Sequence, residues 1–145
     1  MPFSTHSPIP INDKLSVQEL INKLRKRVNI NLIACAAEGQ SSNKYISEAE
    51  LNRPGLALTG YLKVFSSQRV QIIGNTETEF LRQLPEDKQL KAFNNITKFD
   101  IPVIFLTNGN MLPEPLLKQA QEAGIPIFST PYETTRFMLL LKDFL

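Results

Sequence analysis

Short apolar runs that alternate with longer helical segments most constrain the fold of this chain. Four such runs contain β-branched residues and lie close to turn residues: 30–36, 70–74, 102–107 and 125–128. Runs of this length are typical of strands buried within a sheet that is covered on both faces. Because segments of ten or more residues with helical punctuation separate them, we expect an α/β fold: a layered αβα domain with a small, largely parallel or mixed sheet.

Capping residues predict where the helices begin and end. In a capping box, a serine or threonine and a glutamate three residues later satisfy each other's backbone N–H groups. Three pairs have this spacing: Ser16 with Glu19, Thr76 with Glu79, and Thr130 with Glu133. We also expect a break at Pro85, a helix over about 86–98, and a helix that starts at Pro113 or Pro115 and stops at Gly124.

The length and composition indicate one globular domain. The chain has 145 residues, of which 42% are hydrophobic, enough for a core of its own. Residues 1–13 contain three of the ten prolines and no steady periodicity. We therefore expect a flexible N-terminal arm at 1–13, followed by a single domain over 14–145.

Charge and cysteine content exclude several classes of protein. A formal charge of +2 gives a weak overall field, so we expect no nucleic-acid and no membrane partner. No apolar run approaches the roughly 18 residues of a membrane span, and we expect a cytoplasmic protein. Cys35 is the one cysteine and His6 the one histidine. These two residues cannot make a disulfide or a structural zinc site, and we expect no metal.

The stretch "LNRPGLALTGY" at 51–61 has the glycine spacing of a phosphate-binding P-loop. Tyr61 stands where the P-loop needs a lysine, and Leu62 stands where it needs a hydroxyl for magnesium. Furthermore, no clean apolar strand leads into Gly55. The sequence therefore argues against nucleotide hydrolysis at this loop.

Two interpretations of this stretch stay open. Arg53 and the backbone N–H groups of a helix from about Leu56 could bind an anion. Alternatively, Pro54 and Gly55 make a turn, and Arg53 bonds a nearby carboxylate or carbonyl. The candidate residues for binding a ligand or a partner are Asn52, Arg53, Gly55, Thr59, Gly60 and Tyr61.

Catalytic residues are not indicated elsewhere in the chain. Cys35 lies in an apolar run, where an inert thiol is the usual case. His6 has no acid, base or serine close to it in the sequence. The "TNGN" stretch at 107–110 follows a predicted strand, where α/β sheets often bind ligands, but an Asn-Gly turn explains it equally well.

The last predicted helix is more apolar than packing on one sheet requires. It has a stripe on one face, and Met138, Leu139 and Leu145 extend the apolar surface around it. Either the helix docks deeply in its own core, or it forms a junction with a second domain or subunit. The candidate interface residues are Phe137, Leu141, Phe144 and Leu145.

The order of four segments resembles the N-terminal domain of HPr kinase/phosphorylase. They are "LNRPGLALTGYLKVF", "RVQIIGNTETEFL", "IPVIFLTNGNMLPEPLLKQAQEAGIPIFST" and "TTRFMLLLKDFL". The resemblance covers about residues 15–145 and implies an α/β fold similar to the N-terminal domain of muramyl ligases. Its motif positions here are Asn52, Arg53, Pro54, Gly55, Thr59, Gly60, Tyr61, Gln71, Gly74, Thr76 and Glu77.

The resemblance also implies a function. Members of this family phosphorylate a serine of the phosphocarrier protein HPr and remove the phosphate again, in carbon catabolite repression and regulation of the bacterial phosphotransferase system. Their P-loop lies in a C-terminal kinase domain, to which ATP and magnesium would belong. The resemblance therefore implies a non-catalytic regulatory or assembly domain with no cofactor of its own. Its expected partners are that kinase domain and further copies of itself in a homo-oligomer, with HPr an indirect one.

A small-molecule binding module is the alternative function. Its ligand would be a nucleotide-sugar or a phosphorylated metabolite, held by Arg53 and the amides after Gly55.

Overall fold

The computed structural model describes residues 15–145, and the expected arm at 1–13 lies outside the described residues. The strands are β1 Leu15–Ser16, β2 Ile33–Ala36, β3 Tyr45–Ile46, β4 Leu51–Asn52, β5 Val70–Ile73, β6 Ile104–Leu106 and β7 Ile127–Ser129. The α-helices are α1 Val17–Arg27, α2 Gly55–Leu58, α3 Asn75–Arg82, α4 Glu86–Thr97, α5 Glu114–Ala123 and α6 Thr134–Lys142. A 3₁₀ helix, η1, covers Glu38–Ser42.

Five strands form the main sheet in the order β2-β7-β6-β5-β4. The four strands from β7 to β4 are parallel, whereas β2 pairs antiparallel with β7 at the edge. Strands β1 and β3 form a separate antiparallel pair. The expected α/β fold with a largely parallel or mixed sheet is confirmed.

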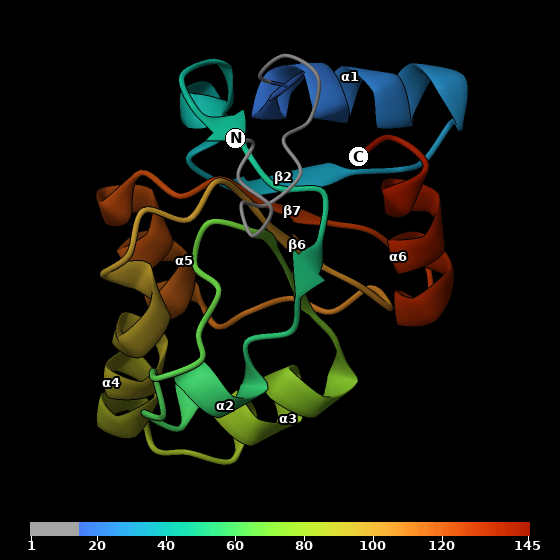
Figure 1. Cartoon of the computed structure of the whole chain (residues 1–145). Helices are drawn as coiled ribbons and strands as arrows, with labels where there is room; N and C mark the ends of the chain where they lie inside the picture. Colours follow the sequence, from blue (N-terminus) through green and yellow to red (C-terminus); the bar gives the residue numbers. More distant parts are fainter. Residues whose placement is uncertain (1–14) are drawn as a thin grey trace.

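Helices cover both faces of this sheet (Figure 1). Strand β6 shows how the two cores are separated, because successive side chains of a strand point to opposite faces. Ile104 and Leu106 pack in the core with α2, α3, α4 and α5, while Phe105 packs in the core with α1 and α6. Both faces of β6 are thus buried, as a continuous apolar run predicts.

Several helix ends follow the predicted signals. The Ser16 hydroxyl accepts from the Glu19 N–H at 3.0 Å, and the Glu19 carboxylate accepts from the Ser16 N–H at 2.9 Å. Pro85 separates α3 from α4, and Gly124 ends α5 with a left-handed φ of 73°. These predictions are confirmed.

The other two predicted capping boxes are wrong. Helix α3 has Gly74 as its N-cap, two residues earlier than the Thr76 signal predicted, and the Glu77 carboxylate accepts from the Gly74 N–H at 2.9 Å. Helix α6 begins at Thr134 with Glu133 as its N-cap. Thr130 cannot cap this helix, because its N–H continues the sheet ladder by donating to the Leu106 carbonyl at 2.9 Å.

Strand β2 is not the buried strand that was predicted. Its Ile33 side chain is 53% exposed, because β2 lies at the edge of the sheet. An apolar run cannot by itself distinguish an edge strand from a central one. The two-residue strands β1, β3 and β4 carry no periodic signal and were not predicted, although β4 ends only two residues before Pro54 and leads into the motif.

Candidate functional site

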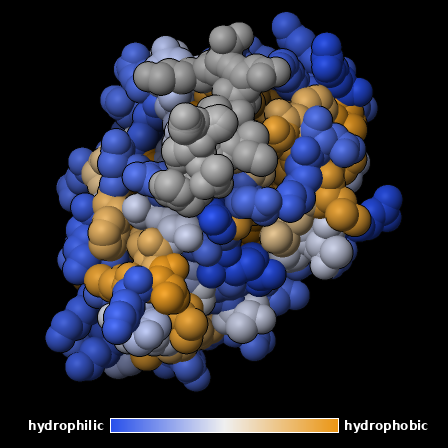
Figure 2. Space-filling view, in the orientation of Figure 1, coloured by the Kyte–Doolittle hydropathy of each residue, from blue (hydrophilic) through white to orange (hydrophobic). Residues whose placement is uncertain are grey.

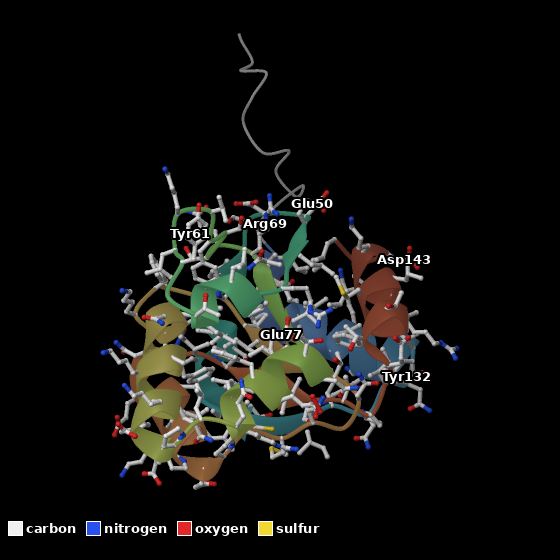
Figure 3. All side chains as sticks on the ribbon, turned by 90° about the horizontal axis from the view of Figure 1, so that it is seen from below. Glu50, Tyr61, Arg69, Glu77, Tyr132 and Asp143 are labelled. Atoms are coloured by element: carbon white, nitrogen blue, oxygen red, sulfur yellow. The ribbon has the colours of Figure 1, made fainter. Side chains whose placement is uncertain are left out.

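The candidate residues lie where β4 and β5 end, at the carboxyl edge of the parallel strands. Strand β4 ends at Asn52, so Arg53 follows it directly, and Gly74 follows β5 in the same way. Figure 3 shows Glu77 near the middle of the view and Tyr61 towards its edge, and Glu77 is buried. Carboxyl edges of α/β sheets commonly hold ligands, so the contacts of these residues decide between binding and structure.

Arg53 and Glu77 form a two-point ion pair. Arg53 Nε donates to Glu77 Oε2 at 3.0 Å, and Arg53 Nη2 donates to Glu77 Oε1 at 2.8 Å. The Glu77 side chain is 4% exposed, while that of Arg53 is 38% exposed. A buried carboxylate is stable only when it is paired and hydrogen-bonded. The guanidinium fork of Arg53 therefore compensates the buried charge of Glu77.

Gly74 completes this pair, and its lack of a side chain is required. Besides the bond from its N–H to Glu77, a Cβ at Gly74 would lie 2.9 Å from Arg53 Nη2 and 2.8 Å from Thr134 Oγ1. Thr134 Oγ1 in turn lies 2.6 Å from Thr107 Oγ1. We call Arg53, Gly74, Glu77, Thr107 and Thr134 the polar junction.

A second tie joins the same two strands. The Asn52 amide donates to Gln71 Oε1 at 2.7 Å, and the buried Gln71 amide donates to the Ser66 and Arg69 carbonyls at 2.9 Å each. The two motif strings thus contact each other: Asn52, at the end of β4, bonds Gln71 of β5, and Arg53, which follows it, bonds Glu77 of α3.

Three candidate residues line a shallow depression. Asn52, Arg53 and Tyr61 line it together with apolar side chains of α2 and the following loop, and its volume is about 140 Å³. Ligand pockets commonly measure about 300–1,000 Å³. The depression therefore fits a group the size of a phosphate better than a whole nucleotide.

The remaining candidates have local roles. Gly55 packs on Glu77, with a Cβ position 3.9 Å from Glu77 Oε2. The Thr59 hydroxyl donates to the Leu56 carbonyl at 2.6 Å, and Gly60 adopts a φ of 105° that favours glycine. The helix expected from about Leu56 is a single turn, α2, so its N–H groups offer little to an anion.

The 107–110 stretch forms a turn. Asn108 and Gly109 have positive φ values of 57° and 68°, and their N–H groups donate to the carbonyls of Tyr132 and Thr130 at 2.7 and 2.9 Å. The Asn110 amide donates to the Thr107 carbonyl and to Asn75 Oδ1, at 2.8 Å each. The turn interpretation accounts for these contacts.

Neither a metal centre nor a reactive thiol emerges from the described residues. Within 15–145, no three His, Cys, Asp or Glu side chains gather closely enough to hold a metal ion. Burial raises the pKa of the Cys35 thiol, which disfavours the thiolate that a nucleophile needs. His6 lies outside the described residues.

Helix α6 places the candidate interface residues mainly inside. Phe137 and Leu141 are fully buried in the core with α1, and Phe144 and Leu145 pack partly against that core. Leu139, which was not among the candidates, is 64% exposed. Helical periodicity could have separated Leu139 from the buried stripe, because it lies two residues from both Phe137 and Leu141.

Across the described residues, no helix is long and apolar enough to cross a membrane.

Comparisons with known proteins identify relatives of this chain. The family described as "HPr Serine kinase N terminus" matches residues 15–145. The HPr kinase/phosphorylase of Chloroherpeton thalassium is 41% identical over 137 residues, which cover 94% of this chain and 40% of that protein. The HPr kinase/phosphorylase of Chlorobium limicola is 50% identical over 100 residues, which cover 69% of this chain and 30% of that protein. The chain thus spans 30 to 40% of the length of these relatives.

A solved structure with a similar fold is the regulatory region of Clostridium perfringens pyrophosphatase, with its CBS and DRTGG domains, in complex with the activator diadenosine tetraphosphate. The TM-score is 0.58 at 12% sequence identity, over 90% of this chain and 47% of that one. At this identity the likeness concerns the fold alone.

Proposed function

The chain belongs to the family of HPr serine kinase N-terminal domains, and from this premise we propose that it is a non-catalytic regulatory or assembly domain of a bacterial HPr kinase/phosphorylase. In this proposal, the domain contributes to the control of carbon metabolism. The observation that carries the proposal is the family match over residues 15–145, in a chain that spans at most 40% of the first relatives.

The polar junction supports a structural function for the motif. Arg53 Nε and Nη2 donate to the Glu77 carboxylate, and the Asn52 amide donates to Gln71. A junction of this kind holds β4, β5 and α3 in fixed positions, which suits a domain that presents a surface to a partner.

The proposal assigns the kinase chemistry elsewhere. ATP, magnesium and the direct contacts with HPr would belong to the part of the relatives that this chain does not match, and this chain would hold no cofactor. Its partners would be that kinase part and further copies of the domain, in the cytoplasm.

The catalytic half of the proposal is tested with HPr itself. The chain is mixed with HPr, ATP and Mg²⁺, and phosphoserine on HPr is measured by mass spectrometry. We expect none, whereas serine phosphorylation would contradict a non-catalytic domain. In a full-length relative, deletion of the matched region should abolish the oligomer or the regulation while the P-loop part still folds.

The assembly half is tested by sedimentation. Removing α6 would take Phe137 and Leu141 out of the core, so a surface substitution is the sharper test. We expect the chain to self-associate and Leu139→Glu to reduce the sedimentation mass without lowering the melting temperature. Asn94→Glu, which adds the same charge at an exposed position of α4, on the other face of the sheet, is the matched control. A wild-type chain that stays monomeric at about 100 µM would contradict self-assembly.

The alternative is a binding module for a nucleotide-sugar or a phosphorylated metabolite at Arg53. What favours it is the depression that Arg53 lines beside Asn52 and Tyr61, with its side chain 38% exposed. The test is a titration of the ¹⁵N-labelled chain with UDP-glucose and with glucose 6-phosphate. Saturable chemical-shift changes at 52–61 would support this function, and their absence would remove it.

A further inference from the structure

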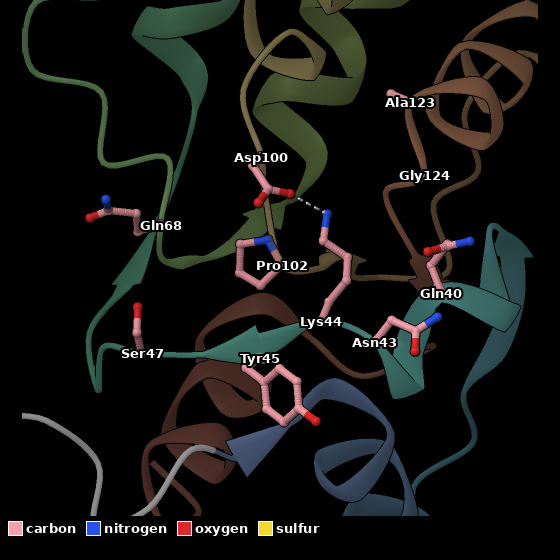
Figure 4. Close-up of a pocket in the computed structure, with 10 residues that line it drawn as sticks. All are labelled: Gln40, Asn43, Lys44, Tyr45, Ser47, Gln68, Asp100, Pro102, Ala123 and Gly124. Atoms are coloured by element: carbon pink, nitrogen blue, oxygen red, sulfur yellow. Dashed lines mark ion pairs between the residues drawn. The ribbon is translucent and has the colours of Figure 1, made fainter.

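A larger cavity lies at the opposite edge of the sheet from the polar junction. Its volume is about 500 Å³, within the range of small-molecule sites. Residues that precede three parallel strands line it: Gln68 before β5, Pro102 before β6 and Gly124 before β7. The segment from η1 to β3 crosses in front of them and contributes Lys44 (Figure 4).

Backbone hydrogen bonds hold the segment from η1 to β3, which forms one wall of this cavity. The Lys44 carbonyl accepts from the Val17 N–H at 2.9 Å, which ties the cavity to the start of α1. The Gln40 carbonyl accepts from the Asn43 N–H at 3.0 Å, and the pairing of β1 with β3 holds the next residues. A site whose walls are already ordered loses little freedom when a ligand binds.

The charges of the cavity point to the class of ligand. Lys44 Nζ lies 2.9 Å from Asp100 Oδ1, and Figure 4 shows the Lys44 side chain extending across the cavity towards Asp100. The Lys44 side chain is only 12% exposed, whereas that of Asp100 is 94% exposed. Lysine is rarely buried, and an ion pair with one fully solvated partner is weak. A ligand could therefore open the pair at little cost.

Neutral polar groups make up the rest of the cavity's recognition surface. The side chains of Gln40, Asn43 and Gln68 are exposed and line it, and each amide can both donate and accept hydrogen bonds. Among the described lining residues, one cation and one anion give a net charge of zero. Such a lining disfavours a nucleotide or another multiply charged anion.

We propose that this cavity binds a small zwitterion of the amino-acid class. The ligand carboxylate takes the place of Asp100 at Lys44 Nζ, and the ligand ammonium pairs with the carboxylate of Asp100. The amides of Gln40, Asn43 and Gln68 bond the polar side chain of the ligand. This site is independent of the proposed regulatory or assembly function and of the depression at Arg53.

The probe for the test is L-serine, which carries both charges and a hydroxyl. The ¹⁵N-labelled full chain is titrated with L-serine, with acetate and with methylammonium chloride at constant ionic strength. We expect saturable shifts at Asn43, Lys44 and Gly124, with half-saturation in the low millimolar range. Acetate carries only the carboxylate and methylammonium only the ammonium group, so each should bind at least about tenfold more weakly than L-serine.

Two substitutions and a control locate the binding. Lys44→Met keeps the aliphatic part of the side chain, and Asp100→Asn keeps the shape of the side chain. Each substitution should weaken the binding of L-serine at least about tenfold. Lys63→Met, at an exposed lysine outside the cavity, should leave the affinity unchanged. An unchanged spectrum outside the cavity shows that each variant is folded.

Three results would overturn the proposal. They are shifts that stay linear with L-serine up to 100 mM, saturable shifts that persist in Lys44→Met, and binding that acetate reproduces and Asp100→Asn does not weaken. The last result would make the ligand a simple anion.

Discussion

Among single residues, Glu77 connects most of the polar junction. Its carboxylate accepts from Arg53 and from the Gly74 N–H, and its side chain is almost fully buried. It therefore joins β4, β5 and α3 at one point. Tyr61, by contrast, is half exposed and lies on the rim of the depression. The motif thus contains both internal ties and surface positions.

Arg53→Ala should destabilise the fold. It leaves the Glu77 carboxylate buried without its cation, which costs about 3–5 kcal/mol for a fully buried pair. Because Arg53 is partly exposed and water can reach the gap, we expect a loss of about 2 kcal/mol in the free energy of unfolding. Chemical denaturation measures it, with the exposed Lys63→Ala as control. An unchanged melting temperature with loss of ligand binding would instead make Arg53 a contact residue.

Gly74→Ala should also destabilise the fold, for a steric reason. The φ of Gly74 is −111°, which any residue adopts, but its Cβ would lie 2.8 Å from Thr134 Oγ1 and 2.9 Å from Arg53 Nη2. Overpacking of this kind costs about 1–3 kcal/mol. Gly39→Ala is the matched control, because a Cβ there meets no atom within 4 Å. Equal melting temperatures for the two variants would contradict the close packing at Gly74.

At the scale of elements, α6 depends on its N-cap. The Glu133 carboxylate accepts from the N–H groups of Thr135 and Arg136 at 3.1 and 3.2 Å. These bonds, that of Thr135 first, lower the pKa of Glu133. The backbone bond from Ser16 lowers the pKa of Glu19 at the start of α1 in the same way. Two helices that pack on one face of the sheet thus have a glutamate with a lowered pKa at their start, Glu133 as the N-cap of α6 and Glu19 in the first turn of α1.

Glu133→Gln should change how stability depends on pH. The pKa of Glu133 is lower in the folded than in the unfolded chain, so its stabilisation is complete above the unfolded value of about 4.3. It disappears as the pH falls through the folded value. Denaturant unfolding at pH 7 and pH 3 should show a difference in stability between wild type and Glu133→Gln that is smaller at pH 3. A gap of equal size at both pH values would contradict the capping function of the charge.

At the scale of the whole molecule, α6 closes one face of the sheet. Phe137 stacks edge-on against Phe105 of β6, with ring centroids 5.0 Å apart, and Leu141 is buried beside α1. Figure 2 shows apolar surface interspersed with polar surface on the visible face of the molecule. In α6, the apolar residues are of two kinds: a stripe buried in the core and one exposed residue, Leu139.

Phe137→Ala and Leu139→Ala should separate these two sources. Phe137→Ala leaves a cavity in the core and should cost about 3–5 kcal/mol of the free energy of unfolding. Leu139→Ala removes an exposed side chain and should change stability by less than about 0.5 kcal/mol. Thermal unfolding of both variants measures the difference. A large loss in Leu139→Ala would mean that this side chain is covered in solution.

Local signals predicted those features that depend on neighbours in the sequence. The apolar runs of β5, β6 and β7, the Ser16 capping box, the break at Pro85 and the glycine stop of α5 were all predicted correctly. The Thr76 box failed because α3 begins earlier, with Gly74 as its N-cap, and the Thr130 box failed because Thr130 continues the ladder of β7. There, the sheet ladder and the Glu77 bond outcompete the local cap.

By itself, the sequence determined the α/β class, the order of the main elements and, through its motif strings, the family. The tertiary structure alone decided that Arg53 pairs with Glu77, that β2 lies at an edge, and that Lys44 meets Asp100 across a cavity. Hydrophobic periodicity and capping act within about one turn or one strand, so a single sequence displays them. Pairings between residues 24 or 56 positions apart depend on how the strands are ordered, and only the folded chain shows that order.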